Sequence, residues 1–487
     1  MNINLITDPW IPVITTDGPR VIAPWQMADA SVMWVDWPRA DLNIACLELL
    51  IGLVFLADPP RDLDDWFDRA DPDPDRLRDR LAGFAPAFDL LGDGPRFMQD
   101  LQVLQGDPNP PDMLFIDSAG AQTAKNNADL LVHRGRYPAL SLPLAAMAIY
   151  AFQDFAPSGG AGNRTSMRGG GPMVTLVAPE NAGLWQTVWA NTPYGQPAGM
   201  DALPWMRPCV ESTNDRKVWP EQTHPVEAFF GMPRRLRLVG DDAVTGVIQR
   251  PYGTNYAGWV HPLSPYYRVK EGAELLPAHP RAGLFGYRNW LGVVAASSRP
   301  DLRQRAAVLA EWHDRGMGAP ARVIVAGWAM DNMKPRDFIL STPPLVHLDA
   351  TSARLMEGMV DAADQYGLAL RQALAPVLAE GEAREAVREA FFAQTQAAFE
   401  ARLADLPNPD AATGWLGDMR NVALTLFDTR AIPGLADRDT RVQQAIVQAR
   451  RNLTAAFNGY GSYGKKAFGA MELPLPETKS KQKRDAA

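Results

Sequence analysis

The stretch ATSARLMEGMVDAADQYGLALRQALAPVLAE, residues 350–380, decides the fold of the C-terminal part of this 487-residue chain. Its apolar and small residues recur at alternating spacings of three and four positions, which places them on one face of a helix. This stripe consists of Met356, Met359, Ala363, Tyr366, Leu370, Ala373 and Val377. The spacing therefore predicts a long amphipathic helix with a single buried face.

Three further stripes of the same kind follow. They consist of Phe392, Thr395, Phe399, Leu403 and Leu406; of Trp415, Met419, Val422 and Leu426; and of Val442, Ile446, Ala449, Leu453 and Ala456. Gly381 and the turn-like stretches PNPDAATG (407–414) and IPGLADRD (432–439) separate them. Four amphipathic helices with short connections predict an up-down four-helix bundle at 350–470. A polar tail at 471–487 follows it.

Residues 1–349 have a different texture, rich in proline, glycine and tryptophan. Short β-like runs such as MVTLVA (173–178) and RLRLVG (235–240) alternate with helical patches. The apolar run NIACLELLIGLVFLA (43–57) predicts one buried helix. No regular alternation of strands and helices fixes the topology. The expected fold class is α+β, with a large irregular mixed N-terminal domain followed by the helix bundle.

Composition narrows the functional classes. The formal net charge of −8 argues against a free-standing, non-specific nucleic-acid binder, which is normally basic. We expect no membrane span and no secretory signal. Two cysteines, Cys46 and Cys209, favour a reducing, cytoplasmic setting. No pair of the six histidines has zinc-site spacing, and hydrolase and P-loop motifs are absent. We therefore expect no enzyme activity, no metal and no cofactor.

One polar segment offers groups that suit a phosphate or a nucleic acid. This stretch, APSGGAGNRTSMRGGGP (156–172), is called the glycine segment below; it contains six glycines, two arginines and no acidic residue. Glycine lets a backbone approach a ligand closely. Arg164 and Arg168 can pair with phosphates. A flexible surface loop is the alternative interpretation.

A second segment, GWAMDNMKPRD (327–337), follows a strand-like run and is predicted to be a loop. It places Asn332, an apolar unbranched Met333 and Lys334 in succession. Two basic stretches accompany these segments: KNNADLLVHRGRYP begins at Lys125, and QRPYGTNYAGWVHPLSPYYR mixes Arg250 with aromatic residues. Such mixing suits backbone contact and base stacking, and equally suits the edge of an aromatic core.

Residue types alone leave other functional classes open. One alternative is an enzyme of unfamiliar fold whose glycine segment binds phosphate, which would need acidic residues nearby. Only Asp331 and Asp337 are at hand. The other is a scaffold subunit that binds protein and never contacts DNA, and it needs neither segment exposed.

Taken in order, the segments resemble the large subunit of the type I-E CRISPR Cascade complex, the CasA family. The resemblance rests on INLITDPWIPV (3–13), GPRFMQD (94–100), the glycine segment, GWAMDNMKPR (327–336) and the C-terminal bundle. It implies a non-catalytic subunit that recognises the protospacer-adjacent motif in duplex DNA and wedges the duplex open for guide pairing. The implied partners are the guide-RNA-containing Cascade subunits, target double-stranded DNA and a recruited helicase–nuclease.

The resemblance also assigns residues. Ser158, Gly159 and Gly160 would approach the minor groove, and Arg250 stands where the family places a groove-reading lysine. Asn332 and Met333 would form the wedge, Lys334 would contact a phosphate, and Lys125, Arg164 and Arg168 are candidate backbone contacts. This sequence departs from the family pattern at Ser158, which replaces a glycine, at Arg250, and at Met333, where some members carry glutamine.

Overall fold

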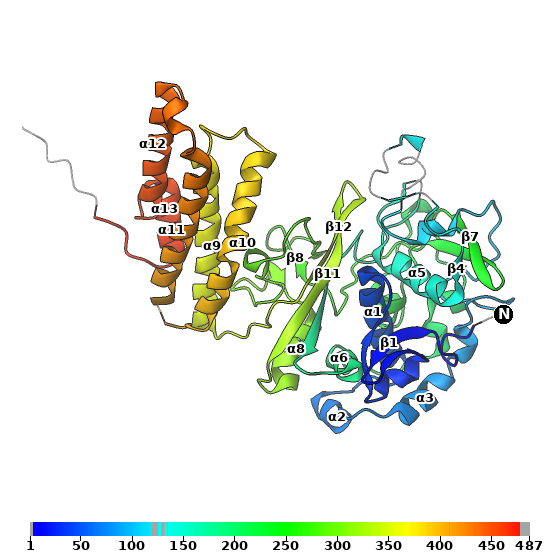
Figure 1. Ribbon diagram of the computed structural model, residues 1–487. Coiled ribbons are helices and arrows are strands. Elements are labelled where there is room, and N and C mark those ends of the chain that lie inside the picture. Colours follow the sequence, from blue (N-terminus) through cyan, green and yellow to red (C-terminus); the bar gives the residue numbers. More distant parts are fainter. Residues whose placement is uncertain are drawn as a thin grey trace, which may run out of the picture. The chain divides into compact units, whose positions relative to one another are not determined.

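The computed structural model describes residues 3–118, 125–127, 132–133, 135–160, 162–408 and 410–477. The chain divides into two compact units, Met1–Gly283 with Asp301–Leu345, and Leu284–Pro300 with Val346–Ala487 (Figure 1). The first unit mixes helices and strands, and the second is helical. The expected α+β class is therefore confirmed.

The described strands of the first unit form four antiparallel sheets of three strands each, in the orders β2-β1-β3, β10-β8-β9, β12-β11-β5 and β4-β7-β6. The strands are β1 (Ile11–Thr15), β2 (Gly18–Ile22), β3 (Val32–Val35), β4 (Leu140–Ser141), β5 (Val174–Pro179), β6 (Arg235–Gly240), β7 (Ala243–Arg250), β8 (Tyr266–Tyr267), β9 (Leu276–Pro277), β10 (Arg303–Gln304), β11 (Ala321–Asp331) and β12 (Lys334–Ser341). Their shortness and separate sheets account for the missing strand–helix rhythm in the sequence.

The described helices of this unit include one long, buried apolar helix, α1 (Ala40–Ala57). The other described helices are α2 (Leu63–Asp68), α3 (Pro74–Ala82), α5 (Leu142–Phe155), α6 (Leu184–Ala190), α7 (Glu227–Phe230) and α8 (Ala307–Gly316). Helix α1 packs against α5 and also contacts α3, α6, α7 and β11. We expected no apolar stretch long enough to span a membrane, but α1 has that length and hydropathy. Of its residues, 89% are buried inside the protein, as in the core helix of a globular domain.

The second unit contains the predicted bundle. Its helices are α9 (Ala350–Ala373), α10 (Glu382–Leu403), α11 (Asp410–Ala431), α12 (Thr440–Ala456) and the shorter α13 (Gly461–Ala470) (Figure 1). Helix α9 contacts the other four. The predicted stripe residues within α9 are buried, and Tyr366 stacks on Phe457 with ring centroids 4.0 Å apart. The 3-4 spacing thus located the face that packs.

The observed elements differ from the sequence-based expectation at several places: α13 was not predicted, and α10 ends at Leu403, before Leu406 of the predicted stripe. Helix α9 ends at Ala373, so Val377 lies beyond it, and α11 begins within the predicted turn at 407–414. The segment Leu284–Pro300, expected in the N-terminal domain, belongs to the helical unit. It does so because Tyr287 stacks on Phe399 with centroids 4.3 Å apart and meets Trp415 edge-on.

Candidate nucleic-acid interface

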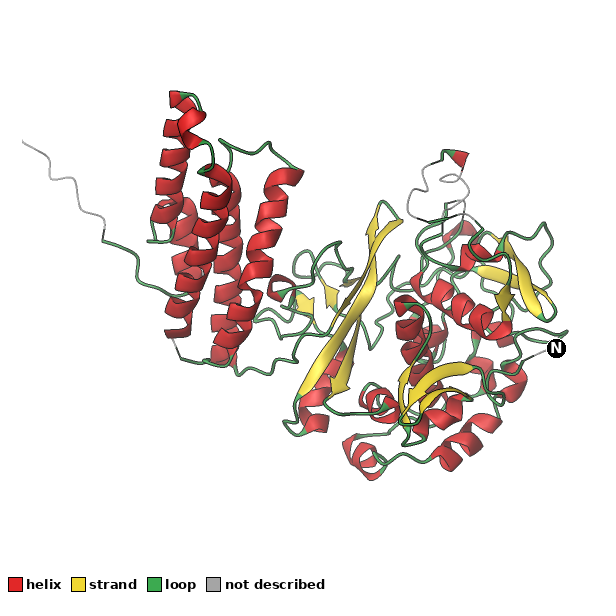
Figure 2. Cartoon of the chain, viewed as in Figure 1, coloured by secondary structure: helices red, strands yellow, loops and turns green. Residues whose placement is uncertain are grey.

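The segment predicted to be a loop at 327–337 is instead the outer half of a β-hairpin. Strand β11 pairs with β12 from Val325 to Asp331, whereas its pairing with β5 ends at Ala326. The hairpin therefore continues past β5 as a two-stranded ribbon, visible in Figure 2. The prediction was wrong because it ended the strand at Gly327, whereas β11 continues through that glycine to Asp331 and β12, an edge strand, tolerates Pro335.

The ribbon ends in a two-residue turn made by Asn332 and Met333. Their φ angles are +48° and +62°, which is the pattern of a type I′ hairpin turn. This turn favours glycine at its second position, and a methionine there is strained. The Arg336 side chain of β12 donates to Asp331 Oδ2 of β11 at 2.7 Å, which connects the two strands next to the turn. A strained, apolar residue at the end of a polar ribbon suggests a functional constraint.

The tip presents its side chains to solvent. Met333 is 47% exposed, and Asn332 and Lys334 are exposed as well. The Lys334 ammonium has no ion-pair partner among the described residues. The Met333 Sδ atom lies against Gly170 of the glycine segment, 3.2 Å from where a Cβ atom on Gly170 would stand. The hairpin tip and the glycine segment are therefore neighbours.

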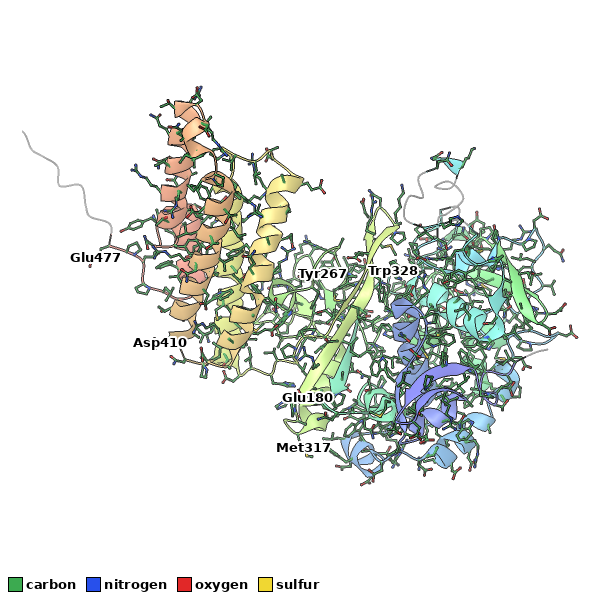
Figure 3. All side chains as sticks on the ribbon, viewed as in Figure 1. Glu180, Tyr267, Met317, Trp328, Asp410 and Glu477 are labelled. Carbon is green, nitrogen blue, oxygen red and sulfur yellow. The ribbon has the colours of Figure 1, made fainter. Side chains whose placement is uncertain are left out.

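Glycines make this close packing feasible. A Cβ atom on Gly171 would lie 2.4 Å from the carbonyl oxygen of Trp328, and one on Gly327 would lie 2.3 Å from that of Pro172. Trp328 is labelled on the hairpin in Figure 3. Both glycines also have positive φ, at +64° and +154°. Any side chain at these positions would push the glycine segment and the ribbon apart.

The other end of the glycine segment forms an exposed turn. Ser158, Gly159 and Gly160 are exposed, and the Asn163 amide donates to the Gly160 carbonyl at 2.7 Å. Gly160 has φ +67°, and a Cβ atom there would meet nothing within 4 Å. Preceding Pro157 contacts Gly170, which also touches Met333. The exposed turn and the hairpin tip therefore lie on one stretch of surface.

The end of β7 reaches the same stretch. Gln249 Nε2 donates to Asn163 Oδ1 at 3.1 Å. Arg250, the next residue, is exposed, with no ion-pair partner among the described residues, and its guanidinium lies beside Gly106, where a Cβ atom would stand 3.1 Å from the NH2 nitrogen. The buried Arg234 holds the glycine segment in place through two hydrogen bonds. Its Nε donates to the Arg164 carbonyl at 2.6 Å, and its NH2 nitrogen donates to the Pro157 carbonyl. Burial lowers the pKa of Arg234 to about 10, so it remains cationic at neutral pH.

The three candidate phosphate contacts have different environments. Lys125 is exposed, although most of its chain neighbours lie outside the described residues. Arg164 is half-buried and donates to the hydroxyl and carbonyl oxygens of Ser212, at 2.8 and 3.1 Å. Arg168 is 1% exposed and ion-paired with two carboxylates. The assignment of Arg168 to a phosphate-contacting surface is therefore corrected: it is a core residue.

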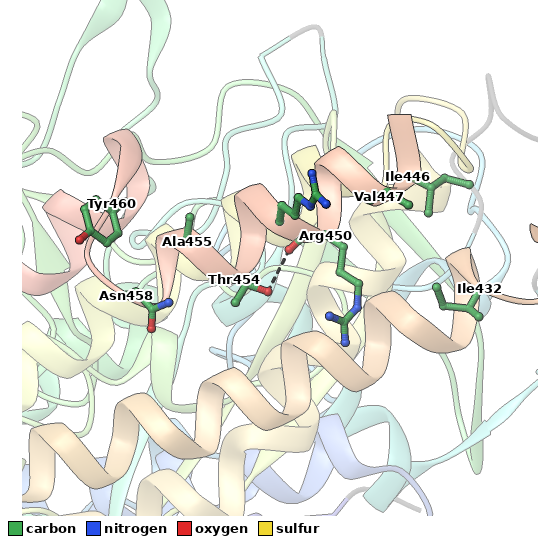
Figure 4. Close-up of a pocket in the computed structure, with 9 residues that line it drawn as sticks. Ile432, Ile446, Val447, Arg450, Thr454, Ala455, Asn458 and Tyr460 are labelled. Carbon is green, nitrogen blue, oxygen red and sulfur yellow. Dashed lines mark hydrogen bonds between the residues drawn. The ribbon is translucent and has the colours of Figure 1, made fainter. Parts of the chain in front are cut away.

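The described residues include no group of three or more His, Cys, Asp or Glu that could hold a metal ion. A surface pocket of about 510 Å³ lies in the helical unit, lined by α12 residues such as Val447 and Arg450 together with Ile432 and Tyr460 (Figure 4). None of the candidate interface residues lines it.

A sequence model of the family described as CRISPR-associated protein Cse1 matches residues 4–426 of the chain. The chain belongs to the Cse1 family. This confirms the resemblance to the CasA family stated from the sequence.

Solved structures of the family share the fold of this Cse1 family member. Thermus thermophilus CasA (Cse1) is 20% identical, with a TM-score of 0.73 over 93% of this chain and 98% of that one. Cse1 from Acidimicrobium ferrooxidans is also 20% identical, with a TM-score of 0.70 over 97% and 99%. A chain of a CRISPR RNA-guided surveillance complex is 16% identical, with a TM-score of 0.69 over 93% and 99%.

Sequence reasoning missed the residues that hold this Cse1 surface together. Arg234, the Gln249–Asn163 pair and the Arg336–Asp331 pair connect positions far apart in the chain or on opposite strands of the ribbon. Arg234 stands directly before the strand-like run RLRLVG (235–240). Nothing in that stretch indicated that Arg234 donates to the carbonyl groups of Arg164 and Pro157. A weak signal was present at the tip, because asparagine favours the first position of a type I′ turn.

Proposed function

We propose that this Cse1 family member is the non-catalytic large subunit of a type I-E CRISPR Cascade. In this role it recognises the protospacer-adjacent motif in duplex DNA and opens the duplex for guide pairing. The observation that carries the proposal is the apolar side chain of Met333, half exposed at the tip of a ribbon beside an exposed glycine turn. Apolar wedges of this kind are inserted between base steps by proteins that bend or unstack DNA.

Each side chain of the interface has a distinct role in this proposal. Met333 is long and unbranched, so it can slide between base pairs and hold a step apart. Asn332 would hydrogen-bond a base edge, and Lys334 would neutralise a phosphate. The backbone at Ser158, Gly159 and Gly160 would approach the minor groove, and Arg250 would read it. Lys125 and Arg164 remain candidate phosphate contacts.

The net charge of −8 fits a subunit that does not bind DNA alone. Guide RNA and the other subunits would supply most of the anchoring, whereas this chain would add a local positive patch. The matched chain of an RNA-guided surveillance complex supports such an assembly. We further propose that this subunit docks the helicase–nuclease and acts in the cytoplasm, where Cys46 and Cys209 stay unpaired.

The two alternative functions make different demands. A protein-only scaffold requires neither segment to be exposed, and the exposure of Met333 and Gly160 favours DNA contact. A phosphate-transferring enzyme requires acids available to a ligand beside the glycine segment, but Asp331 pairs with Arg336, and Glu48 and Asp154 pair with the buried Arg168. Nuclease or ATPase activity of the purified chain that a point substitution abolishes would favour the enzyme.

The proposal is tested by assembling the chain with guide RNA and the remaining Cascade subunits. We expect the assembly to bind duplex target DNA only when a protospacer-adjacent motif flanks the target. Omitting this chain should abolish that preference. Equal binding with and without the chain, measured at matched salt, would leave the scaffold function as the better account.

We expect Gly160→Leu to lower the affinity of the assembled complex for duplex target by about tenfold or more, because a lost groove contact costs about 1–3 kcal/mol. Space at Gly160 is open, so the fold and the assembly should survive. Gly160→Asn is the matched control, since asparagine adopts positive φ more readily and carries a shorter side chain. Unchanged target binding by Gly160→Leu would show that this turn is only a linker.

Lys334→Ala should weaken binding of intact and pre-opened target alike. Loss of one phosphate contact should also reduce the slope of log affinity against log salt by about one. Lys270→Ala is the control, because Lys270 is an exposed lysine of the same unit outside the interface. An identical salt slope for Lys334→Ala and the wild type would remove Lys334 from the set of phosphate contacts.

A further inference from the structure

Three charged side chains meet in the core beneath the glycine segment. Arg168 of that segment places its NH2 nitrogen 2.9 Å from Glu48 Oε2 of α1 and 2.6 Å from Asp154 Oδ1 of α5. The Arg168 and Glu48 side chains are 1% and 0% exposed, and that of Asp154 is 11% exposed. Arg168 NH1 also donates to Ser264 Oγ at 3.0 Å. The glycine segment is thus tied to the two central helices of its unit.

The charges in this cluster do not balance if both acids are ionised. Arg168 supplies one positive charge against two carboxylates. Nearby His261 is neutral, because burial lowers its pKa and its Nδ1 accepts from the Leu263 amide at 3.2 Å. The Tyr150 hydroxyl donates to the Phe229 carbonyl at 3.0 Å, and burial raises its pKa. One carboxyl group must therefore keep its proton to avoid an unpaired buried charge.

Geometry and burial indicate which carboxyl keeps it. Glu48 is completely enclosed, whereas Asp154 is partly open and makes the shorter contact with Arg168. Both carboxyl oxygens of Glu48 and the Oδ2 atom of Asp154 lack a hydrogen-bond partner within the described part of the chain, so a proton shared between the two carboxyl groups would serve oxygens that are otherwise unpartnered. Burial, with the Asp154 charge beside it, raises the pKa of Glu48 well above the usual range, even though Arg168 lowers it.

We propose that Glu48 is a positioning residue that acts as a neutral carboxylic acid, and that with Asp154 it anchors Arg168 and so fixes the glycine segment. The anchor acts on the interface through the residues that follow Arg168. Gly170 touches Met333 and Gly171 touches Trp328, so a shift of Arg168 moves the contacts of the hairpin tip. The consequence for DNA binding rests on the proposed function; the anchor itself does not.

Two substitutions that each replace one carboxyl group by an amide of the same shape separate the roles of the acids. Glu48→Gln copies the neutral acid, so the glycine segment should stay as ordered as in the wild type. Asp154→Asn leaves Arg168 without its counter-charge. Hydrogen exchange of the Ser166, Gly169 and Gly171 amides, which donate to backbone carbonyls, should then accelerate by at least about 100-fold.

The reverse pattern, or equal acceleration by both substitutions, would overturn the proposal. Should Asp154→Asn fail to fold, the double variant Asp154→Asn, Arg168→Met removes both charges and tests the tether. It should fold and still exchange rapidly at the Gly169 and Gly171 amides. Slow exchange in that folded variant would show that Arg168 does not hold the segment.

The pH dependence of the free energy of unfolding reports the protonation state of Glu48, and a purely structural role of Glu48 in packing would not change it. Above about pH 5 the unfolded chain releases the Glu48 proton while the folded chain retains it. Wild-type stability should therefore fall relative to that of Glu48→Gln as the pH rises from about 5 to about 8. Parallel profiles for the two proteins would contradict a protonated Glu48.

Binding of duplex target by the assembled complex separates the anchor from the proposed function. We expect Asp154→Asn to weaken binding and Glu48→Gln to leave it unchanged. Rapid exchange in the segment together with undiminished target binding would support the anchor and contradict the DNA-contacting role of the glycine segment.

Discussion

Met333→Gly is expected to slow the opening of an intact target duplex by about 30-fold, because unstacking a base step costs a few kcal/mol that the wedge would no longer offset. Glycine suits the second position of a type I′ turn, where Met333 has φ +62°. The substitution therefore removes the side chain without weakening the hairpin. Opening is measured as the rate of guide pairing by the assembled complex on a fluorescently labelled target.

A target already opened as a bubble beside the motif needs no wedge, so it should restore the rate for Met333→Gly. Met333→Leu keeps an apolar body of similar size and is the matched control, expected to open intact duplex faster than Met333→Gly, because leucine also serves as a wedge between base steps. Met333 is 47% exposed, so neither substitution should cost the roughly 2–5 kcal/mol of a core truncation. Equal defects on intact and bubble targets would contradict the wedge.

Gly171→Ala is expected to be the most damaging single change in the glycine segment. Its new Cβ atom would stand 2.4 Å from the Trp328 carbonyl oxygen and 2.8 Å from Met330 Cε. Positive φ adds strain, so we expect a loss of about 2–4 kcal/mol in the free energy of unfolding. Chemical denaturation of the isolated chain measures this loss.

Gly160→Ala is the control for that experiment, because its φ of +67° is close to the +64° of Gly171 while the space around it is open. Gly160→Ala introduces the strain of a side chain at positive φ, but its Cβ atom does not collide with any neighbouring atom. The difference between the two variants therefore isolates the contact with the hairpin. Equal losses for both would show that the glycine segment does not need to lie against the ribbon.

The helical unit was largely predictable from the sequence because each of its long helices buries one face, and the apolar residues of that face recur every three or four positions. The stripe at Met356, Met359 and Tyr366 is buried as expected. Its boundaries were less predictable, since Tyr287 joins the bundle from a distant segment through contacts with Phe399 and Trp415. Such contacts leave no periodic trace in the sequence.

The candidate interface was predictable in part. The resemblance named Gly160, Arg250 and Met333, but the local signal for the hairpin was weak, because its turn has asparagine at the first position and lacks the usual glycine at the second. Arg168 was misassigned because a basic residue in a glycine-rich stretch looks exposed, whereas it pairs with Glu48 in the core. A single glutamate within the apolar run at 43–57 was the available signal, since a buried charge needs a partner.

Base unstacking at the motif tests the central claim most directly. A 2-aminopurine placed at the base step beside the motif reports unstacking by a rise in fluorescence, and a guide unmatched to the target prevents opening by pairing. The complex containing wild-type chain should produce the rise, and the complex containing Met333→Gly should not. A rise of equal size with both, or none with the wild type, would contradict a duplex-opening role for the hairpin tip.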